Sequence, residues 1–293
     1  MRVLVTGGSG YIGRHAVAGL LARGHEVHVV SRGPAQMPGA TVQRGDLLEP
    51  GVPDAVIGRV RPDAILHLAW EATPGLYWTS PDNPRWADAT ITLARAAREC
   101  GAVRFVGVGS CAEYDWTAGH CDEAGTALLP TTPYGRAKLA AGEAVRALSR
   151  EGFSTAWGRV FFLFGGDEHP ARLVPSVALA IGRGEPARCS HGEQQRDFLH
   201  VEDVAAALVA LVESDVTGAV NIASGEAHRV RDVVEGLATR LGHPDLVHLG
   251  AIDAQGPLVL TAEAQRLRSE VGWRPRLSFD AALDAAAEYW RSL

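Results

Sequence analysis

This chain of 293 residues has few cysteines, no long apolar run and no excess of positive charge. Its four cysteines, Cys100, Cys111, Cys121 and Cys189, show no CxxC pair and no Cys/His ligand spacing. This pattern argues against a bound metal and predicts reduced thiols in a cytoplasmic protein. No apolar run approaches the roughly 20 residues of a membrane span. A formal net charge of −6 argues against nucleic acid as a partner.

What the sequence does contain is an ordinary globular composition, 46% apolar and 21% charged. It shows no internal repeat and no linker between independent halves. In the first half, short β-rich runs alternate with helical patterns. This alternation predicts an α/β fold in which helices cover a doubly wound parallel sheet.

A glycine-rich turn follows the first predicted strand. Residues 3–6 (VLVT) lead into GGSGYIG, and apolar residues then recur at helical spacing as far as Arg23-Gly24. In this context Gly7 permits a tight turn, Gly10 lets a pyrophosphate approach the backbone, and Gly13 lets the helix pack against the strand. Because unpaired N–H groups at a helix start favour anions, the stretch predicts a dinucleotide site.

The TGGSGYIG spacing resembles the short-chain dehydrogenase/reductase family, in particular its extended branch that acts on nucleotide sugars. Further signatures of that branch follow along the chain: GDL at 45–47, LHLA at 66–69, RDFLHVEDVA at 196–205 and VGWRPR at 271–276. The resemblance implies a Rossmann domain at 1–164 with a return segment at 196–222. A smaller α/β substrate subdomain is expected mainly at 165–195 and 223–293.

The resemblance also implies a set of cofactor contacts. Asp46 is expected to contact adenine, and residues 66–69 are expected beside the ribose and nicotinamide. The predicted cofactor-binding residues are Gly7, Gly10, Tyr11, Ile12, Gly13, Ser31, Arg32, Asp46, Leu47, Leu68, Ala69, Tyr134 and Lys138.

Residues 134–138 (YGRAK) place a tyrosine and a lysine four positions apart on a predicted helix, so both lie on one helix face. A nearby ammonium lowers the pKa of a phenol from its usual value of about 10. We therefore expect Tyr134 to act as a general acid or base near neutral pH. The resemblance implies that Lys138 also bonds the nicotinamide ribose. It further implies that Ser110, just beyond the strand at 103–108, bonds the substrate oxygen.

Two positions limit the predicted chemistry. The 4,6-dehydratases of this family carry an Asp-Glu pair directly after the Ser/Thr, where this chain has Cys111 and Ala112. Neither residue supplies the acid or base, so the sequence argues against dehydration. Glu113, one place later, is predicted to be a structural or rim residue.

The second predicted strand ends in Ser31-Arg32, where NAD-specific relatives carry an acidic residue that holds the adenosine ribose. A carboxylate repels a 2′-phosphate, whereas a guanidinium suits phosphate oxygens. Ser31 and Arg32 therefore predict NADP(H) as the cofactor, with Arg14 as a second phosphate contact. The alternative is that Arg32 points to solvent and NAD also binds.

At the substrate end, Arg196 matches the family arginine that grips a nucleotide diphosphate. The structural alternative is an ion pair with Asp197 or Asp203. Phe162 stands where relatives have an asparagine, and Arg172 is a candidate substitute for a missing diphosphate contact. A nucleotide-free sugar or another carbonyl compound therefore stays open as the substrate.

Several other side chains receive no assigned role. His67 and His200 lie in apolar segments and are predicted to be packed and hydrogen-bonded. An aromatic group in the loops is interpreted either as a stacking surface or as core packing: Trp70, Tyr77, Trp78 and Trp116.

These patterns favour an NADPH-dependent ketoreductase that acts on a nucleotide-linked deoxysugar at C4. A nucleotide-sugar 4-epimerase using NAD(P) is the first alternative, and a non-catalytic NADP(H)-sensing regulator is the second. The small and apolar residues of the helix at 85–101 and of the YxxxK helix imply a two-fold homodimer, by resemblance.

Overall fold

The computed structural model describes residues 1–293, and seven parallel strands form its main sheet. Along the sheet their order is β11 (Gly218–Ile222), β7 (Ser154–Val160), β5 (Arg104–Ser110), β4 (Ala64–His67), β1 (Arg2–Thr6), β2 (Glu26–Ser31) and β3 (Thr41–Arg44). The inner strands β1, β4, β5 and β7 are buried along nearly their whole length. Such near-continuous apolar runs are typical of parallel strands that are covered on both faces.

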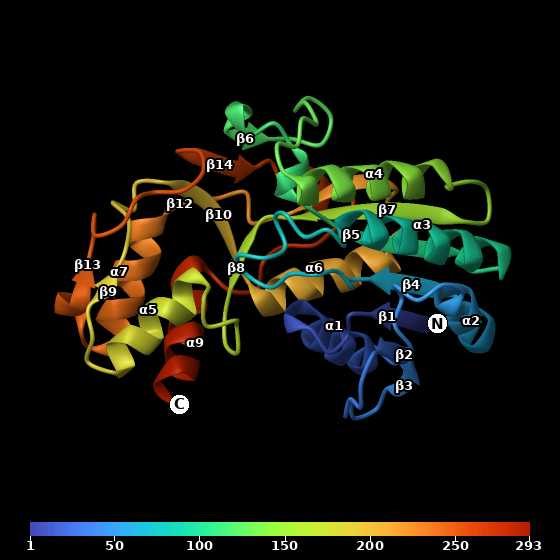
Figure 1. Cartoon of the computed structure of the whole chain (residues 1–293), viewed down its shortest axis with the longest axis horizontal. Helices are drawn as coiled ribbons and strands as arrows, with labels where there is room; N and C mark the ends of the chain where they lie inside the picture. The colour runs from blue at the N-terminus through green and yellow to red at the C-terminus, as the bar shows by residue number, and fades with distance from the viewer.

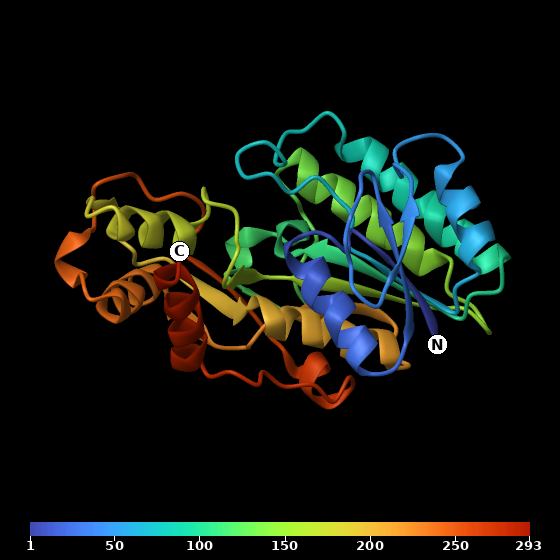
Figure 2. The same cartoon turned by 90° about the horizontal axis from the view of Figure 1, so that it is seen from below.

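Helices cover both faces of this sheet, as Figures 1 and 2 show. Helices α1 (Tyr11–Ala22) and α6 (Val201–Glu213) pack together on one face. The other face carries α2 (Val52–Val60), α3 (Asn83–Glu99) and α4 (Pro133–Ala147). Separate apolar clusters fill the two interfaces. The predicted doubly wound α/β fold is therefore confirmed.

A second region, on the left in Figure 1, has its own apolar core. Helices α5 (Leu173–Gly182), α7 (Val230–Leu241) and α9 (Phe279–Arg291) pack against one another there. The accompanying sheet contains β12 (Ala227–Arg229), β10 (Gln195–His200), β14 (Val259–Ala262) and β6 (His120–Cys121), with β8 (Phe162–Phe164) also paired to β10. Strands β9 (Ala187–Arg188) and β13 (Val247–His248) pair separately. After β10, the chain returns to the main sheet as α6 and β11.

The helix predicted at 85–101 begins two residues earlier, because Pro84 occupies its first turn, and ends before Gly101, whose φ of 90° stops it. The YxxxK helix begins at Pro133 and is capped by the hydroxyl of Thr132, which accepts from the Gly135 amide at 3.0 Å. The short helix α8 (Gln265–Ser269) follows β14. No helix of the chain has both the length and the apolar character needed to cross a bilayer.

Candidate active site

The glycine turn between β1 and α1 lies against the end of β4. Gly7 has a φ of 68°, and a Cβ there would come within 2.8 Å of the Ala69 nitrogen. A Cβ at Gly13 would collide with the Gly7 carbonyl oxygen. No side chain caps α1 at Gly10, so the N–H groups of its first turn are free of side-chain acceptors. This uncapped, Cβ-free cradle fits a pyrophosphate, and the turn brings the predicted Leu68 and Ala69 to its edge.

Arg14, in the first turn of α1, is occupied in another way. Its guanidinium forms an ion pair with Asp167 and donates to the Asp167 carbonyl at 3.1 Å. The segment after β8 therefore folds over the start of α1. The contact of Arg14 with a 2′-phosphate stays a prediction, and in this structure the guanidinium is paired with Asp167.

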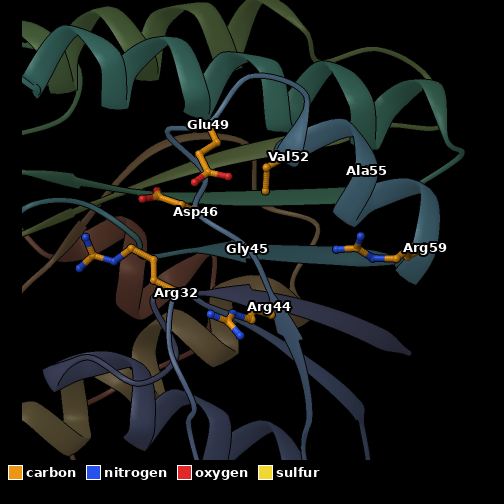
Figure 3. Close-up of a pocket in the computed structure, with 8 residues that line it drawn as sticks. All are labelled: Arg32, Arg44, Gly45, Asp46, Glu49, Val52, Ala55 and Arg59. Carbon is orange, nitrogen blue, oxygen red and sulfur yellow. The ribbon is translucent and has the colours of Figure 1, made fainter.

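A cavity of about 400 Å³ opens where β2 and β3 end (Figure 3). Arg32 and Arg44 extend from the two strand ends, and Arg59 approaches from α2. None of the three guanidiniums forms an ion pair or a hydrogen bond within the chain. Asp46 and Glu49 lie on the other side of the cavity, and Asp46 accepts from the Leu48 amide at 3.0 Å. The cavity therefore holds three unpaired cations against two carboxylates.

Two predicted cofactor residues next to this cavity have side chains that make contacts within the protein. The Ser31 hydroxyl donates to the Gly33 carbonyl at 3.0 Å and so shapes the turn after β2. Leu47 is buried in the apolar cluster under α2 and α3. Arg44 and Arg59 were not anticipated from the sequence, because neither belongs to a recognisable motif.

Ser110, Tyr134 and Lys138 meet at the end of β5 and the start of α4. Lys138 is buried, and its amine donates to the Val108 carbonyl at 2.7 Å. The Ser110 hydroxyl accepts from the Ala112 amide at 3.2 Å and lies near enough to the Tyr134 phenol to lower the pKa of that phenol. Lys138 is also the only lysine of the chain, beside 27 arginines. That composition is itself a signal that position 138 requires an amine.

The proton affinities differ from the expectation of a phenol acidified by its lysine. Burial raises the pKa of the Tyr134 phenol, and the Ser110 hydrogen bond opposes this only in part. Burial also lowers the pKa of Lys138 to about 7, against the attraction of Glu113. The prediction was wrong because it treated the ammonium as a permanent charge, whereas the same buried slot desolvates both groups.

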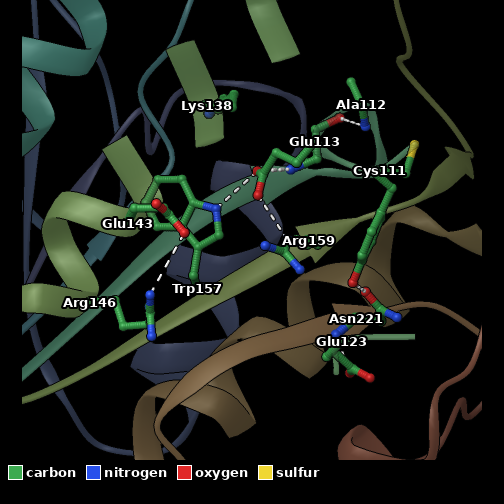
Figure 4. A network of polar contacts seen from close by, with 12 residues as sticks. Cys111, Ala112, Glu113, Glu123, Lys138, Glu143, Arg146, Trp157, Arg159 and Asn221 are labelled. Atoms are coloured by element: carbon green, nitrogen blue, oxygen red, sulfur yellow. Dashed lines mark hydrogen bonds and ion pairs between the residues drawn. The ribbon is translucent and has the colours of Figure 1, made fainter. Parts of the chain in front are cut away.

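Glu113 holds the backbone of Ser110, and Figure 4 shows its carboxylate bonded to Trp157 and Arg159. This fully buried carboxylate accepts from the Ser110 amide at 2.8 Å and from the Trp157 indole at 2.9 Å. Its other oxygen accepts from Arg159 Nε at 2.8 Å in a buried ion pair. Glu113 is thus a structural residue, as predicted, and its partner Arg159 comes from β7. The ion pair fixes the strand end that presents Ser110.

Aromatic rings enclose the Tyr134 side chain. The rings of Tyr77, Trp78 and Trp70 lie edge-on to it, with centroid separations of 4.9, 5.6 and 6.2 Å. Trp116 in turn lies edge-on to Trp78. The sequence left the role of this aromatic group open. In the structure it forms the wall around the candidate general acid.

Neither of the two predicted substrate arginines forms an ion pair with a carboxylate of the chain. Arg196 is buried, donates to the carbonyls of residues 195 and 257 at 2.8 Å, and packs over the Phe162 ring. The alternative ion pairs are absent, because Asp197 accepts from Ser224 and Gly225 and Asp203 pairs with Arg276. Arg172 packs over Tyr77. It therefore lies beside the aromatic wall.

The two histidines behave as predicted. His67 is buried between the hydroxyls of Thr6 and Thr90, at 2.7 and 2.8 Å. Burial and the nearby Lys138 lower its pKa to about 3, so the ring is neutral. His200 is buried at the start of α6, where its ring faces the Glu202 amide at 3.4 Å.

Known proteins resemble this chain in sequence and in structure. The chain is 29% identical over 304 residues to the UDP-glucose 4-epimerase of Corynebacterium glutamicum, which covers 94% of this chain and 91% of that protein. It is 30% identical over 313 residues to the dTDP-6-deoxy-L-talose 4-dehydrogenase (NAD(P)(+)) of Kitasatospora kifunensis, at 99% and 94% coverage. Among solved structures, MoeE5 in complex with UDP-glucuronic acid and NAD superposes with a TM-score of 0.83 at 29% identity, covering 100% of this chain and 99% of MoeE5.

Residues 3–223 match the description "NAD dependent epimerase/dehydratase family". The matched segment runs from β1 through the glycine turn, Ser110 and the YxxxK helix to the end of β11. It thus covers three quarters of the chain and every residue of the candidate catalytic group. The chain therefore belongs to the NAD dependent epimerase/dehydratase family and is an enzyme of the extended short-chain dehydrogenase/reductase type.

Proposed function

We propose that this enzyme is an NADPH-dependent ketoreductase that acts on a nucleotide-linked sugar, with reduction at C4. The observation that carries the proposal is the cavity with three unpaired guanidiniums at the ends of β2 and β3 and on α2. An exposed cluster of arginines without carboxylate partners favours a bound anion, and a 2′-phosphate is the anion that separates NADPH from NADH. A reductase consumes a reduced cofactor at every turnover, whereas an epimerase regenerates its own.

The catalytic group suits the direction of reduction. When bound, the reduced dinucleotide supplies the hydride that goes to the ketone carbon. Because burial raises the pKa of Tyr134, its phenol carries a proton at neutral pH and is ready to donate it to the forming alkoxide. The Ser110 hydroxyl polarises the same oxygen. Lys138 places the ribose and the phenol.

Two observations support a nucleotide sugar as the substrate. Both sequence relatives named above act on nucleotide-linked sugars by their names, and one is a 4-dehydrogenase that uses NAD(P)(+). In addition, the buried Arg196 is bonded only to main-chain carbonyls, so its charge has no anionic partner within the chain. A substrate diphosphate would supply that partner.

A nucleotide-sugar 4-epimerase is the second candidate, because the chain is 29% identical to the UDP-glucose 4-epimerase of Corynebacterium glutamicum. The two candidates differ in what the purified protein contains. An epimerase carries NAD through purification and interconverts its sugars without added cofactor. A ketoreductase oxidises one NADPH for each ketone reduced.

The dissociation constants of NADPH and NADH, measured by fluorescence titration, test the proposal. Replacement of Arg32 or Arg44 by Ala is expected to weaken NADPH about 10-fold to 100-fold, the loss of a charge-assisted hydrogen bond. NADH affinity is expected to stay within about 3-fold, because it has no 2′-phosphate. Arg274→Ala, which removes an exposed and unpaired arginine outside the cavity, is the matched control. Equal use of both cofactors by the wild type, with Arg32→Ala silent, would overturn the proposal.

A further inference from the structure

The face of the Trp70 indole covers the amine of Lys138. The amine nitrogen lies 3.9 Å from the centroid of the indole ring. This is well inside the roughly 6 Å at which a cation and an aromatic face attract each other. The only hydrogen-bond acceptor of the amine within the chain is the Val108 carbonyl, at 2.7 Å. Of the three donors of an ammonium, one therefore meets a carbonyl and the indole face takes up part of the remaining charge.

Trp70 is held in this place from two sides. Its indole N–H donates to the side-chain oxygen of Asn83 at 2.9 Å, and the Asn83 amide donates to the Tyr77 carbonyl at 2.8 Å. The Trp86 ring stacks behind it with a centroid separation of 6.3 Å. Asn83 is fully buried at the start of α3. The indole is thus a fixed surface over the amine.

The other groups that face Lys138 attract the ammonium less, and the Tyr134 ring lies 5.9 Å from the amine, compared with 3.9 Å for Trp70. Glu113, in the turn after β5, attracts the ammonium but is already paired with Arg159. His67, at the end of β4, is neutral, and Tyr134, one turn earlier on α4, is protonated at neutral pH. Burial lowers the pKa of Lys138 to about 7. An additional attraction of modest size therefore decides whether the amine is charged when the enzyme works.

We propose that Trp70 is a positioning residue that keeps the buried Lys138 amine protonated and directed toward Tyr134. The aromatic face replaces part of the hydration that the ammonium loses in the slot. The effect on catalysis rests on the proposed function, whereas the effect on the charge of Lys138 does not. An amine that stays protonated offers its third donor to a ligand beside the phenol. A deprotonated amine loses both the charge and that donor.

The composition of the chain agrees with this assignment. With 27 arginines and one lysine, basic positions elsewhere in the chain are filled by guanidiniums. A guanidinium is charged in any environment, so an indole would not be needed to hold its proton. The single amine, that of Lys138, lies in a buried position where its neighbours control its charge. At that position the Trp70 indole determines whether the amine is protonated.

The unique lysine allows a direct test. Protein labelled with ε-¹³C lysine gives one side-chain signal, whose chemical shift against pH reports the pKa of Lys138 in the intact enzyme without ligand. Trp70→Met keeps an apolar filling but removes the aromatic face, and is expected to lower that pKa by about 0.5 to 1.5 pH units. Trp70→Phe should give a smaller fall, since phenylalanine binds cations less strongly.

The Lys138 pKa is expected to be highest in the wild type, lower in Trp70→Phe and lowest in Trp70→Met. Trp78→Met is the control, because Trp78 contacts Tyr134 but not the lysine, and it should leave the Lys138 pKa unchanged. A pKa in Trp70→Met equal to or above that of the wild type would overturn the inference, since water entering the slot raises the pKa of an amine. Trp70→Phe retains a ring and decides the matter if the Met variant does not fold.

A second readout separates this inference from the proposed function. The dissociation constant of NADPH is measured from pH 6 to pH 9 in the wild type and in Trp70→Phe. Affinity is expected to fall with rising pH in both proteins, with the midpoint displaced to lower pH in the variant. If NADPH does not bind to either protein, the proposed function fails while the titration of Lys138 still decides the role of Trp70.

Discussion

The arginine cavity, here called the open end of the candidate cofactor site, and the buried slot of Lys138, its closed end, hold charge in opposite ways. At the ends of β2 and β3, Arg32 and Arg44 are exposed and without partners, and Arg59 joins them from α2. At the end of β5, a single amine is buried among aromatic rings. Anion binding in the arginine cavity depends on how many cations line it, whereas the charge of Lys138 depends on what surrounds its amine. An open site can use permanent charges, whereas a buried site needs a charge that its neighbours can control.

The difference follows from solvation. An exposed guanidinium keeps most of its hydration and loses little when no anion is bound. A buried ammonium has lost its hydration, so its protonation depends on what replaces the water. We therefore expect substitutions at the closed end to change chemistry, and those at the open end to change cofactor choice. Three predictions separate the two ends, beginning with the largest expected effect.

Tyr134→Phe tests the closed end most directly. Loss of the phenolic proton donor is expected to lower kcat about 10²-fold to 10⁴-fold. The dissociation constant of NADPH should change little, because the ring and its aromatic neighbours are retained. Turnover is followed by NADPH absorbance with a 4-keto nucleotide sugar. A variant that retained more than about a tenth of the wild-type kcat would remove Tyr134 from the role of general acid.

Arg159→Met tests how far the buried ion pair of Arg159 with Glu113 stabilises the folded protein. Removal of the guanidinium leaves the Glu113 carboxylate buried and unpaired, and is expected to lower the free energy of unfolding by about 3–5 kcal/mol. Arg59→Ala, at the open end, should change it by less than about 0.5 kcal/mol. Both values come from urea denaturation of the variants and the wild type.

The double variant Arg159→Met/Glu113→Leu sharpens this comparison. Without either charge, part of the stability should return, while the Ser110 amide and the Trp157 indole lose their acceptor. The kcat of the double variant should lie below that of the wild type, because the Ser110 amide has lost the carboxylate that holds it at 2.8 Å. If the double variant is as unstable as Arg159→Met, the unpaired Glu113 carboxylate is not the cause of the lost stability.

Much of the fold and the outline of the site could be predicted from the sequence. The glycine turn, the strand-end Ser110 and the Tyr134–Lys138 helix each occupy a short local pattern whose meaning does not depend on distant residues. The lysine and tyrosine pKa values could not be predicted in this way, since desolvation depends on how Trp70 and Tyr77 close over α4. Local spacing gives neighbours along the chain but not the depth at which they are buried.

The same reasoning explains the other differences. Arg14 is engaged by Asp167, a residue 153 positions away, and Glu113 is held by Arg159 on another strand. No spacing rule reports such partners. Arg44 and Arg59 join Arg32 only because β2 and β3 end at one edge of the sheet. The predicted division into two domains and the predicted homodimer stay predictions, as does the cytoplasmic location.

A third environment, the buried carboxylate of Glu168 in the segment after β8, carries the smallest predicted effect. Glu168 is buried with one oxygen unpartnered, and burial raises its pKa to about 8, against the attraction of Arg172. In the unfolded chain a glutamate titrates near 4.3. Between about pH 4.3 and pH 8 the folded protein therefore binds more protons than the unfolded chain, and Glu168 makes stability fall as pH rises.

Glu168→Gln should remove that slope, since the amide keeps the shape of the carboxyl but does not titrate. Urea denaturation is expected to show that the variant gains about 2–4 kcal/mol on the wild type between pH 5 and pH 9, at up to about 1.4 kcal/mol for each pH unit below the folded-state pKa. Lys138 also titrates in this range with the opposite sign, but it is present in both proteins and cancels in the difference. Parallel pH dependences in variant and wild type would mean that Glu168 is solvated.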